Sequence, residues 1–483
     1  MLYLTFMYKF PEKFEFGWSQ AGFQSEMGGN STIDDKSDWF LWTHDKENII
    51  SGLVSGDFPE NGANYWNNYK IFHENAAEMG LKTARIGIEM SRIFPERPDI
   101  NLDSIKSYND INKDILDDLD KYAAKESINN YIDIFNDLKN KNIKTILNLY
   151  HWPLPLWLNN PVNVRKGIDV NKNGWLNDDI IKYFALFGSY IAYKMDKVVD
   201  MYSTMNEPNV VFGNGFVNIK SGFPPSYLSI ESSNIARINI LKAHSMAYDS
   251  MKKFTKKMIG IIYANTDFTP LTANDMEAVK KAEYDARWYF FDSLINGNNE
   301  LNINGKKLDW IGINYYTRTV IKSLNSSYKS LAGYGHSGEK NSASPDNRPT
   351  SDVGWEFYPE GLYDVLMSYW NRYKIPMYIT ENGIADEGDY QRPYYLVSSI
   401  YSVKRALDEG ANIMGYLHWS LVDNYEWAIG FKPRFGLIEM DYSTKKLYWR
   451  PSAFIYQEIA KTNSIPDKIM NLNRIPPLKE LRH

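Results

Sequence analysis

Two glutamates stand out because each follows an apolar run that is typical of a buried strand. Glu207 follows residues 198–206, and Glu381 follows residues 375–380. A proline comes directly after the first glutamate and Asn-Gly after the second, and such residues end strands. We therefore expect both carboxyl groups at the carboxyl ends of strands. Two carboxyl groups that face one pocket are the equipment for cleaving a glycosidic bond.

The remainder of the chain alternates between strand-like and helix-like periodicity. The expected strands cover residues 14–22, 82–89, 143–150, 198–207, 258–265, 309–316, 375–381 and 413–419. The expected helices cover residues 64–79, 127–138, 178–193, 230–254, 275–294, 359–373, 396–407 and 453–460. This alternation predicts an α/β protein with one domain over residues 1–483, a single (β/α)8 TIM barrel.

Three long stretches show little regular periodicity. They cover residues 97–120, 323–351 and 420–435, and each lies shortly after an expected strand. In a parallel barrel, loops that follow strands gather at the C-terminal face, where active sites form. We expect long loops at that face, and we expect these three to wall the site. The first, residues 97–120, is rich in Asp and Asn and could equally be a solvated excursion or a subunit contact.

Composition excludes several classes of function. The net charge is −5 and the basic residues are scattered, so no basic field suits nucleic acid. The 483 residues include no cysteine, which excludes disulfides and a thiolate nucleophile and fits a cytoplasmic location. No apolar window is long enough to span a bilayer. Residues 1–6 are an expected extension upstream of a natural start at Met7.

Seven of the eight expected strands end in groups that can handle a sugar. A single polar residue at a strand end is usually a cap or turn residue, but the repetition is harder to explain in that way. The groups are Gln24, Arg85, His151-Trp152, Asn206-Glu207, Asn314-Tyr315-Tyr316, Glu381 and His418-Trp419, with Asp423 to Trp427 shortly after the last strand.

These motifs resemble those of glycoside hydrolase family 1, the β-glucosidase and β-galactosidase family. Residues 204–208, Thr-Met-Asn-Glu-Pro, resemble its acid/base motif, and residues 379–383, Ile-Thr-Glu-Asn-Gly, its nucleophile motif. The archaeal β-glycosidase branch is the nearest likeness, through residues 16–26, 151–157 and 476–478. The resemblance covers nearly the whole chain from Met7.

The resemblance implies retention of configuration through two displacements. Glu381 would be the nucleophile and Glu207 the acid/base catalyst. Arg85 is the cation expected to keep Glu381 ionised, and Tyr316 would donate a hydrogen bond to it. Asn206 would bind the C2 hydroxyl of the sugar. Retention requires carboxyl groups roughly 5–5.5 Å apart, against about 6.5–9.5 Å for inversion.

By the same resemblance, a set of residues would bind the glycone, which is the sugar on the non-reducing side of the bond. An acid in this set, Glu426, argues against a 6-phosphosugar. Met90, where the family usually has tryptophan, and residues 432–435 depart from the pattern, without altering a proposed catalytic group. The set is Gln24, His151, Trp152, Asn206, Trp419, Glu426, Trp427 and Phe435.

We interpret the sequence as a retaining exo-β-glycosidase that acts on terminal β-D-glucosides, β-D-galactosides or β-D-fucosides and needs no metal or cofactor. The resemblance also suggests a homotetramer, with no nucleic acid or membrane as partner. One alternative is a metal-dependent hydrolase on the same barrel, although with only seven histidines the usual sets of metal ligands are hard to assemble. Another is an inactive sugar-binding barrel. Turnover of a chromogenic glycoside with and without chelator separates the three.

Overall fold

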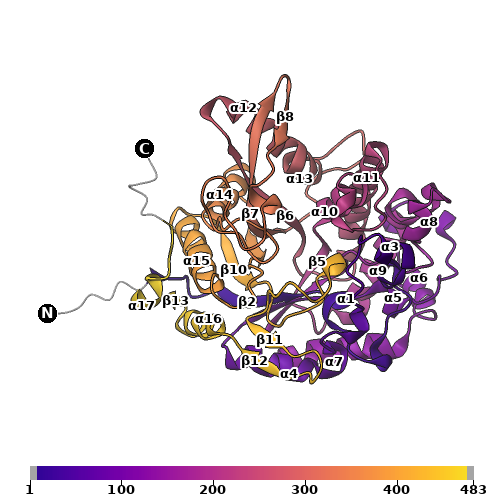
Figure 1. Ribbon diagram of the computed structural model, residues 1–483. Coiled ribbons are helices and arrows are strands. Elements are labelled where there is room, and N and C mark those ends of the chain that lie inside the picture. The colour runs from indigo at the N-terminus through magenta and orange to yellow at the C-terminus, as the bar shows by residue number, and fades with distance from the viewer. Residues whose placement is uncertain (1–7, 476–483) are drawn as a thin grey trace.

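The computed structural model describes residues 8–475. The expected start at Met7 and the motif at residues 476–478 lie outside this range. Eight parallel strands form a closed ring in which β6 also pairs with β7 (Figure 1). In ring order they are β2 (Glu15–Gln20), β3 (Thr83–Gly87), β4 (Lys144–Asn148), β5 (Met201–Asn206), β6 (Ile259–Pro270), β7 (Trp310–Leu324), β9 (Met377–Glu381) and β10 (Ile413–His418).

A helix follows each strand of the ring, so the predicted (β/α)8 TIM barrel is confirmed. The eight expected strands and eight expected helices all appear, but β6 and β7 run to Pro270 and Leu324, past their expected ends at residues 265 and 316. The helix expected over residues 275–294 is divided by a π-helical turn at Tyr284–Trp288. The main outer helices are α4 (Tyr65–Glu78), α7 (Lys125–Asn140), α9 (Asp179–Met195), α11 (Ile230–Met251), α12 (Met276–Glu283), α13 (Tyr289–Ile295), α14 (Gly361–Tyr373), α15 (Arg392–Asp408) and α16 (Pro451–Thr462).

Short strands and short helices connect or extend the elements of the barrel. Two small strand pairs lie outside the ring: β1 (Tyr8–Lys9) with β13 (Ser464–Ile465), and β11 (Ile438–Met440) with β12 (Leu447–Trp449). The last residues of the ring strand β7 also pair with β8 (Ser327–Ser330). The short helices are α1 (Gly22–Ser25), α2 (Asp38–His44), α3 (Lys46–Ile50), α5 (Met90–Ile93), α6 (Lys113–Leu119), α8 (Pro161–Arg165), α10 (Pro208–Phe216) and α17 (Asp467–Met470).

The barrel is filled by large side chains from successive strands. One cluster of fully or nearly fully buried residues comes from six strands of the ring, β4 to β7, β9 and β10. Trp310 is its largest member, and its indole nitrogen donates at 3.1 Å to the carbonyl of Tyr202 in β5, one strand beyond the neighbouring β6. The members are Ile146, Met201, Ile262, Trp310, Tyr378 and Leu417. This packed interior fixes the strand ends, and therefore the residues that follow them.

The first and last parts of the chain close the ring together. In Figure 1 the indigo β2 lies beside the orange-yellow β10, and the two pair in parallel from Glu15–Gly415 to Trp18–His418. Outside the ring, β1 pairs with β13. Among residues 8–475, no helix is both long and apolar enough to cross a membrane.

One expectation about the loops was wrong. Residues 97–120 contain α6, and they line neither the pocket nor the cleft described below. They pack instead on α9, where Tyr190 donates to Asp120 (2.6 Å) and Lys182 donates to the carbonyl of Leu102 (2.9 Å). Hydrogen bonds from tyrosines of α9 therefore hold this acidic stretch against that helix and not at the barrel mouth. Loops 323–351 and 420–435 do contribute side chains to the mouth, His336 and Trp427 among them.

Candidate active site

Glu207 follows the last residue of β5 and caps the amino end of α10. Its φ of 48° lies in the left-handed region, which costs energy for a residue with a side chain. Its amide donates to the carbonyl of Ile262 at 2.9 Å, which ties this turn to the neighbouring strand β6. Pro208 fits the first position of α10 because it needs no amide donor there. The strand end therefore aims the carboxyl group into the barrel mouth.

Glu381 is the last residue of β9, and its side chain is buried, with 4% of its surface exposed. Two donors hold its carboxyl oxygens. A guanidinium nitrogen of Arg85, from β3, donates to Oε1, and the Tyr316 hydroxyl, from β7, donates to Oε2 at 2.8 Å. Arg85 is itself oriented by Ser19 and by His151, whose Nδ1 lies 2.9 Å from Nη1. Three strands thus converge on one carboxylate.

A buried amide network connects the two glutamates. Asn314 of β7 donates to Glu207 Oε1 at 2.8 Å. Asn314 also donates to Oδ1 of Asn206 at 3.0 Å, and Asn206 accepts from Arg85 as well. Because Arg85 also contacts Glu381, this network joins the two carboxyl groups, and both line the same pocket.

The surroundings favour different protonation states for the two carboxyl groups. Burial, and then the charge of Glu381, raise the pKa of Glu207 to about 8. Burial also raises the pKa of Glu381, while Arg85 and Tyr316 act to lower it. Because only Glu381 contacts a permanent cation, it is the group that ionises first. At neutral pH the pair offers one carboxylate and one carboxylic acid, as acid–nucleophile chemistry requires.

The closed end of the pocket is polar. Gln24 of α1 is 1% exposed, and its Nε2 donates to Asn424 Oδ1 at 3.0 Å and to the Tyr425 carbonyl at 2.9 Å. Among the described residues its Oε1 has no partner, so this oxygen is available to a ligand hydroxyl. Burial raises the pKa of the neighbouring Glu426 to about 8, so this carboxyl group can both donate and accept near neutral pH.

Aromatic side chains form the walls of the pocket, which has a volume of about 140 Å³. His151 stacks against Trp419 and Trp427, with ring centroids 5.9 and 5.8 Å apart. Burial and Arg85 lower the pKa of His151 well below its usual value, so the ring is neutral. Trp152 and Phe435 complete the walls. Flat, apolar faces with hydroxyl-binding groups at one end suit a single sugar ring.

Comparison with known proteins agrees with this geometry. Residues 7–304 and 294–465 match the model of glycosyl hydrolase family 1. The chain belongs to glycosyl hydrolase family 1. It is 58% identical to a β-galactosidase of Saccharolobus solfataricus over 99% of this chain and 100% of that one. A β-galactosidase of Sulfolobus acidocaldarius is 53% identical over the same shares.

Solved structures of the family share the fold closely. The β-glycosidase of Thermosphaera aggregans has a TM-score of 0.93 at 45% identity, covering 97% of this chain and 100% of that one. The resemblance to the archaeal β-glycosidase branch is thereby confirmed. This family 1 protein is a retaining exo-β-glycosidase, and neither a metal-dependent hydrolase nor an inactive sugar-binding barrel is supported.

The structure of this family 1 chain brings all the expected site residues together. Most of them line the pocket, while Arg85 and Asn206 lie beneath it and reach Glu381 and one another through hydrogen bonds. The departure at Met90 is buried in the main core and does not line the pocket. The pocket-lining members are Gln24, His151, Trp152, Glu207, Tyr316, Glu381, Trp419, Glu426, Trp427 and Phe435.

Sequence reasoning missed several residues of this family 1 site, among them Asn314 and Trp355. Asn314 was noted only as a strand-end residue, yet it bonds Glu207; its place two positions before Tyr316, on the same face of β7, was the available signal. Trp355 lines the pocket against Tyr316, with ring centroids 5.1 Å apart, and no periodic pattern marks its loop.

Proposed function

We propose that this chain releases β-linked glucose, galactose or fucose from non-reducing ends, with Glu381 as nucleophile and Glu207 as acid/base catalyst. The buried network that connects both carboxyl groups through Asn314 and Arg85 is the observation that supports these roles best. The relatives described above are β-galactosidases, and a relative from Thermotoga maritima, 28% identical, is a β-glucosidase.

In the first displacement, an oxygen of Glu381 attacks the anomeric carbon while Glu207 gives its proton to the departing glycosidic oxygen. The C–O bond to the leaving group breaks, and a glycosyl ester on Glu381 forms. The hydrogen bond from Tyr316 to Oε2 gives the two carboxyl oxygens different partners and fixes the orientation of the carboxyl group for attack. Arg85 stabilises the carboxylate before it reacts.

In the second displacement, Glu207 acts as a base. Formation of the ester removes the negative charge of Glu381, so the pKa of Glu207 falls and its carboxylate can take a proton from water. The resulting hydroxide oxygen attacks the same anomeric carbon, and Glu381 leaves as a carboxylate. Two inversions return the sugar to its original configuration.

The pocket supports a neutral sugar rather than a 6-phosphosugar. Lysine is absent among the described residues that line it, and Arg85 is already engaged by Glu381 beneath the floor. Glu426 and Gln24 instead offer hydroxyl-binding groups at the closed end. A closed end for one ring also supports exo action.

A panel of aryl β-glycosides tests the proposed activity. We expect hydrolysis of the glucoside, the galactoside or the fucoside, with no requirement for added metal. A slowly released fluorinated glycoside should label one peptide by mass spectrometry, and the label should lie on Glu381. A label on another residue, or none, would contradict the assignment of the nucleophile.

We also propose that the protein is a single domain over residues 1–483, that it works in the cytoplasm, and that it assembles as a tetramer. A solved β-glucosidase mutant, 45% identical, derives from a tetrameric structure. The lack of cysteine fits a reducing compartment. Sedimentation of the purified protein tests the tetramer, and fractionation of native cells tests the location.

A further inference from the structure

A larger cleft opens from the sugar pocket. It has a volume of about 910 Å³ and shares Trp152, Glu207 and Tyr316 with the pocket. Because Glu207 would protonate the glycosidic oxygen, the group beyond that oxygen, the aglycone, must lie in this cleft. The residues that line it therefore decide which leaving groups fit.

Most polar side chains of the cleft already have partners within the protein. Asn209 exchanges two hydrogen bonds with the backbone of Ala264, at 3.0 and 3.2 Å. Asn265 donates to the carbonyl of Tyr263 and accepts from Tyr369, both at 2.8 Å. These amides leave little free capacity to recognise a ligand. Recognition of a ligand would therefore depend on other polar side chains of the cleft.

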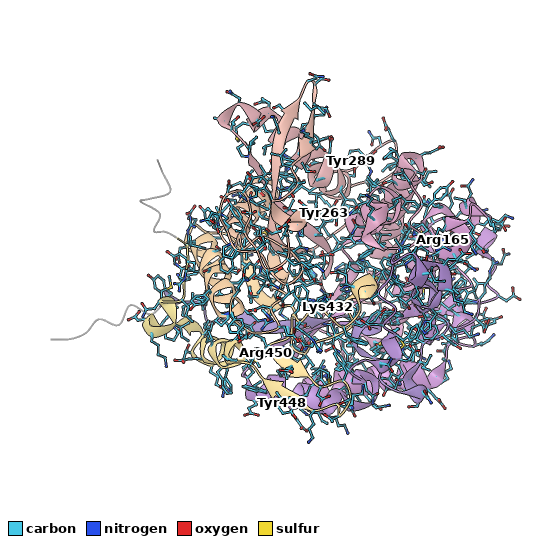
Figure 2. The ribbon with its side chains drawn as sticks, viewed as in Figure 1. Arg165, Tyr263, Tyr289, Lys432, Tyr448 and Arg450 are labelled. Carbon is cyan, nitrogen blue, oxygen red and sulfur yellow. The ribbon has the colours of Figure 1, made fainter. Side chains whose placement is uncertain are left out.

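Two lysines are available. Lys220 and Lys432 line the cleft, both are exposed, and neither forms an ion pair or hydrogen bond with any residue in the described range 8–475. Asp57, from another loop, accepts from the amide of Phe431, next to Lys432, and forms no ion pair with that lysine. In Figure 2, Lys432 lies close to the centre of the view rather than at its periphery, where Arg165 and Tyr448 lie.

The two lysines come from different loops that meet. Lys220 lies in the turn Ile219–Ser221, and Lys432 follows the turn Trp427–Ile429. Gly222 is so close to the second loop that an added Cβ would lie 2.5 Å from the Cβ of Ala428. The two loops thus contact each other, and both lysines line the cleft that the loops border. Two like charges that line one cleft favour an anionic partner.

The sugar pocket does not cancel this positive field. Glu207 is the sole acid among the described residues that line the cleft, and burial raises its pKa to about 8, so it is neutral at pH 7. Glu381 is paired with Arg85. Among the residues that line the cleft, an anionic group would therefore meet two lysines and one protonated acid; Asp57, which accepts from Phe431, does not line the cleft.

The surface beside the lysines is apolar. Ile429, which is 46% exposed, lines the cleft together with Phe223 and Trp355. Exposed apolar and aromatic side chains next to free cations suit a ligand with a flat, apolar body and an acidic substituent.

We propose that Lys220 and Lys432 select β-glycosides whose leaving group is an apolar, typically aromatic, body bearing a carboxylate or similar anion. This inference rests on the proposed function, because it assigns the aglycone of the same reaction. It makes the two lysines specificity residues for the leaving group and leaves the roles of the glutamates unchanged.

The test compares two substrates that differ in one charge, the meta-carboxyphenyl and the meta-carbamoylphenyl β-glucosides. The quantity measured is the ratio of kcat/KM for the acid over the amide. We expect the ratio to fall about threefold in Lys432→Met and in Lys220→Met, and about tenfold in the double variant, as for partly exposed charge pairs. Comparing ratios cancels the intrinsic difference between the two phenols. Lys329→Met, an exposed lysine of β8 outside the cleft, is the matched control and should keep the wild-type ratio.

Salt gives a second readout. Raising the ionic strength from about 0.01 M to about 1 M shortens the screening length from about 30 to 3 Å, so the wild-type ratio should fall towards that of the double variant. Lys432→Glu should lower the ratio below that of Lys432→Met. Equal ratios in the wild type and the double variant would overturn the proposal.

Failure of the inference and failure of the proposed function give different results. If the wild type hydrolyses neither glucoside nor the corresponding galactosides, the proposed function fails. Calorimetry with free meta-hydroxybenzoate and meta-hydroxybenzamide still tests the lysines, because it needs no turnover. Tighter binding of the acid that is lost in the double variant supports the proposal, and equal binding of both phenols overturns it.

Discussion

At the scale of single residues, the site works through unequal surroundings of two identical side chains. Glu381 contacts a guanidinium and a phenol, whereas Glu207 has one neutral amide donor and an apolar environment. Burial raises the pKa of both carboxyl groups, and Arg85 opposes this more strongly at Glu381, which it contacts, than at Glu207. This difference assigns the roles of nucleophile and acid without any further group.

Removal of the Glu381 side chain gives the first prediction. Glu381→Gly should lower kcat by about 10⁴-fold or more, because no other described group lies opposite Glu207 to form the ester. External azide or formate should restore turnover and should yield an inverted, α-linked product, as chromatography and NMR can show. Glu387→Gly, an exposed glutamate in the same loop, is the control and should need no rescue. A rescued β-linked product would contradict the role of Glu381.

The second prediction concerns pH. Glu207 must be protonated for the first displacement, and its pKa is raised to about 8. Activity is therefore present below this pKa and should be lost as the pH rises through about 8, seen as an alkaline limb of kcat/KM. A dinitrophenyl glycoside needs no protonation of its leaving group, so the limb should vanish with that substrate. A limb that stays at the same pH would assign it to a different residue.

At the scale of elements, the ring of strands fixes the site because each strand ends where a functional residue begins. Close strand contact is possible only where side chains are small. At Gly17 of β2, an added Cβ would lie 1.8 Å from the carbonyl oxygen of Thr83 in β3. The backbone of these two strands would have to move to admit it. Such a movement would reach the site, because Gln24 follows β2 and Arg85 belongs to β3.

The third prediction follows from this contact. Gly17→Ala should lower the free energy of unfolding by about 1–3 kcal/mol, as overpacking does in other cores. Gly213→Ala is the matched control, since it lies in α10 with no atom within 4 Å of the new Cβ and should be neutral or slightly stabilising. Denaturant unfolding of the two variants measures the difference. Equal denaturant midpoints for the two variants would show that the close β2–β3 contact at Gly17 does not restrict the size of the side chain there.

At the scale of the whole molecule, the last part of the chain holds the loop that carries Glu426 and Trp427. Asp423 is fully buried and accepts from Arg450 at 3.0 and 2.9 Å and from the amide of Gly436 at 2.9 Å. Arg450 immediately precedes α16, so this ion pair joins the final helix to the barrel mouth. Removal of one partner leaves a buried, unpaired charge.

The fourth prediction tests this connection and the proposal of a single domain. Asp423→Asn should destabilise the protein by about 3–5 kcal/mol, through the unpaired Arg450. If the chain is one domain, circular dichroism and loss of activity should follow one coincident transition in wild type and variant alike. Two separate transitions would contradict the single domain. Lys446→Met, an exposed site in the same region, is the control.

The sequence by itself determined the barrel and the two glutamates. Periodicity is local, so eight strands and eight helices could be predicted, and a glutamate directly after a strand is a local pattern as well. Tertiary structure decided the other features. The bond from Asn314 to Glu207, the packing of residues 97–120 on α9, and the contact of the loop at Gly222 with the loop at Ala428 all join segments far apart in the chain. Their energies depend on distance and burial in space, and spacing along the chain encodes neither.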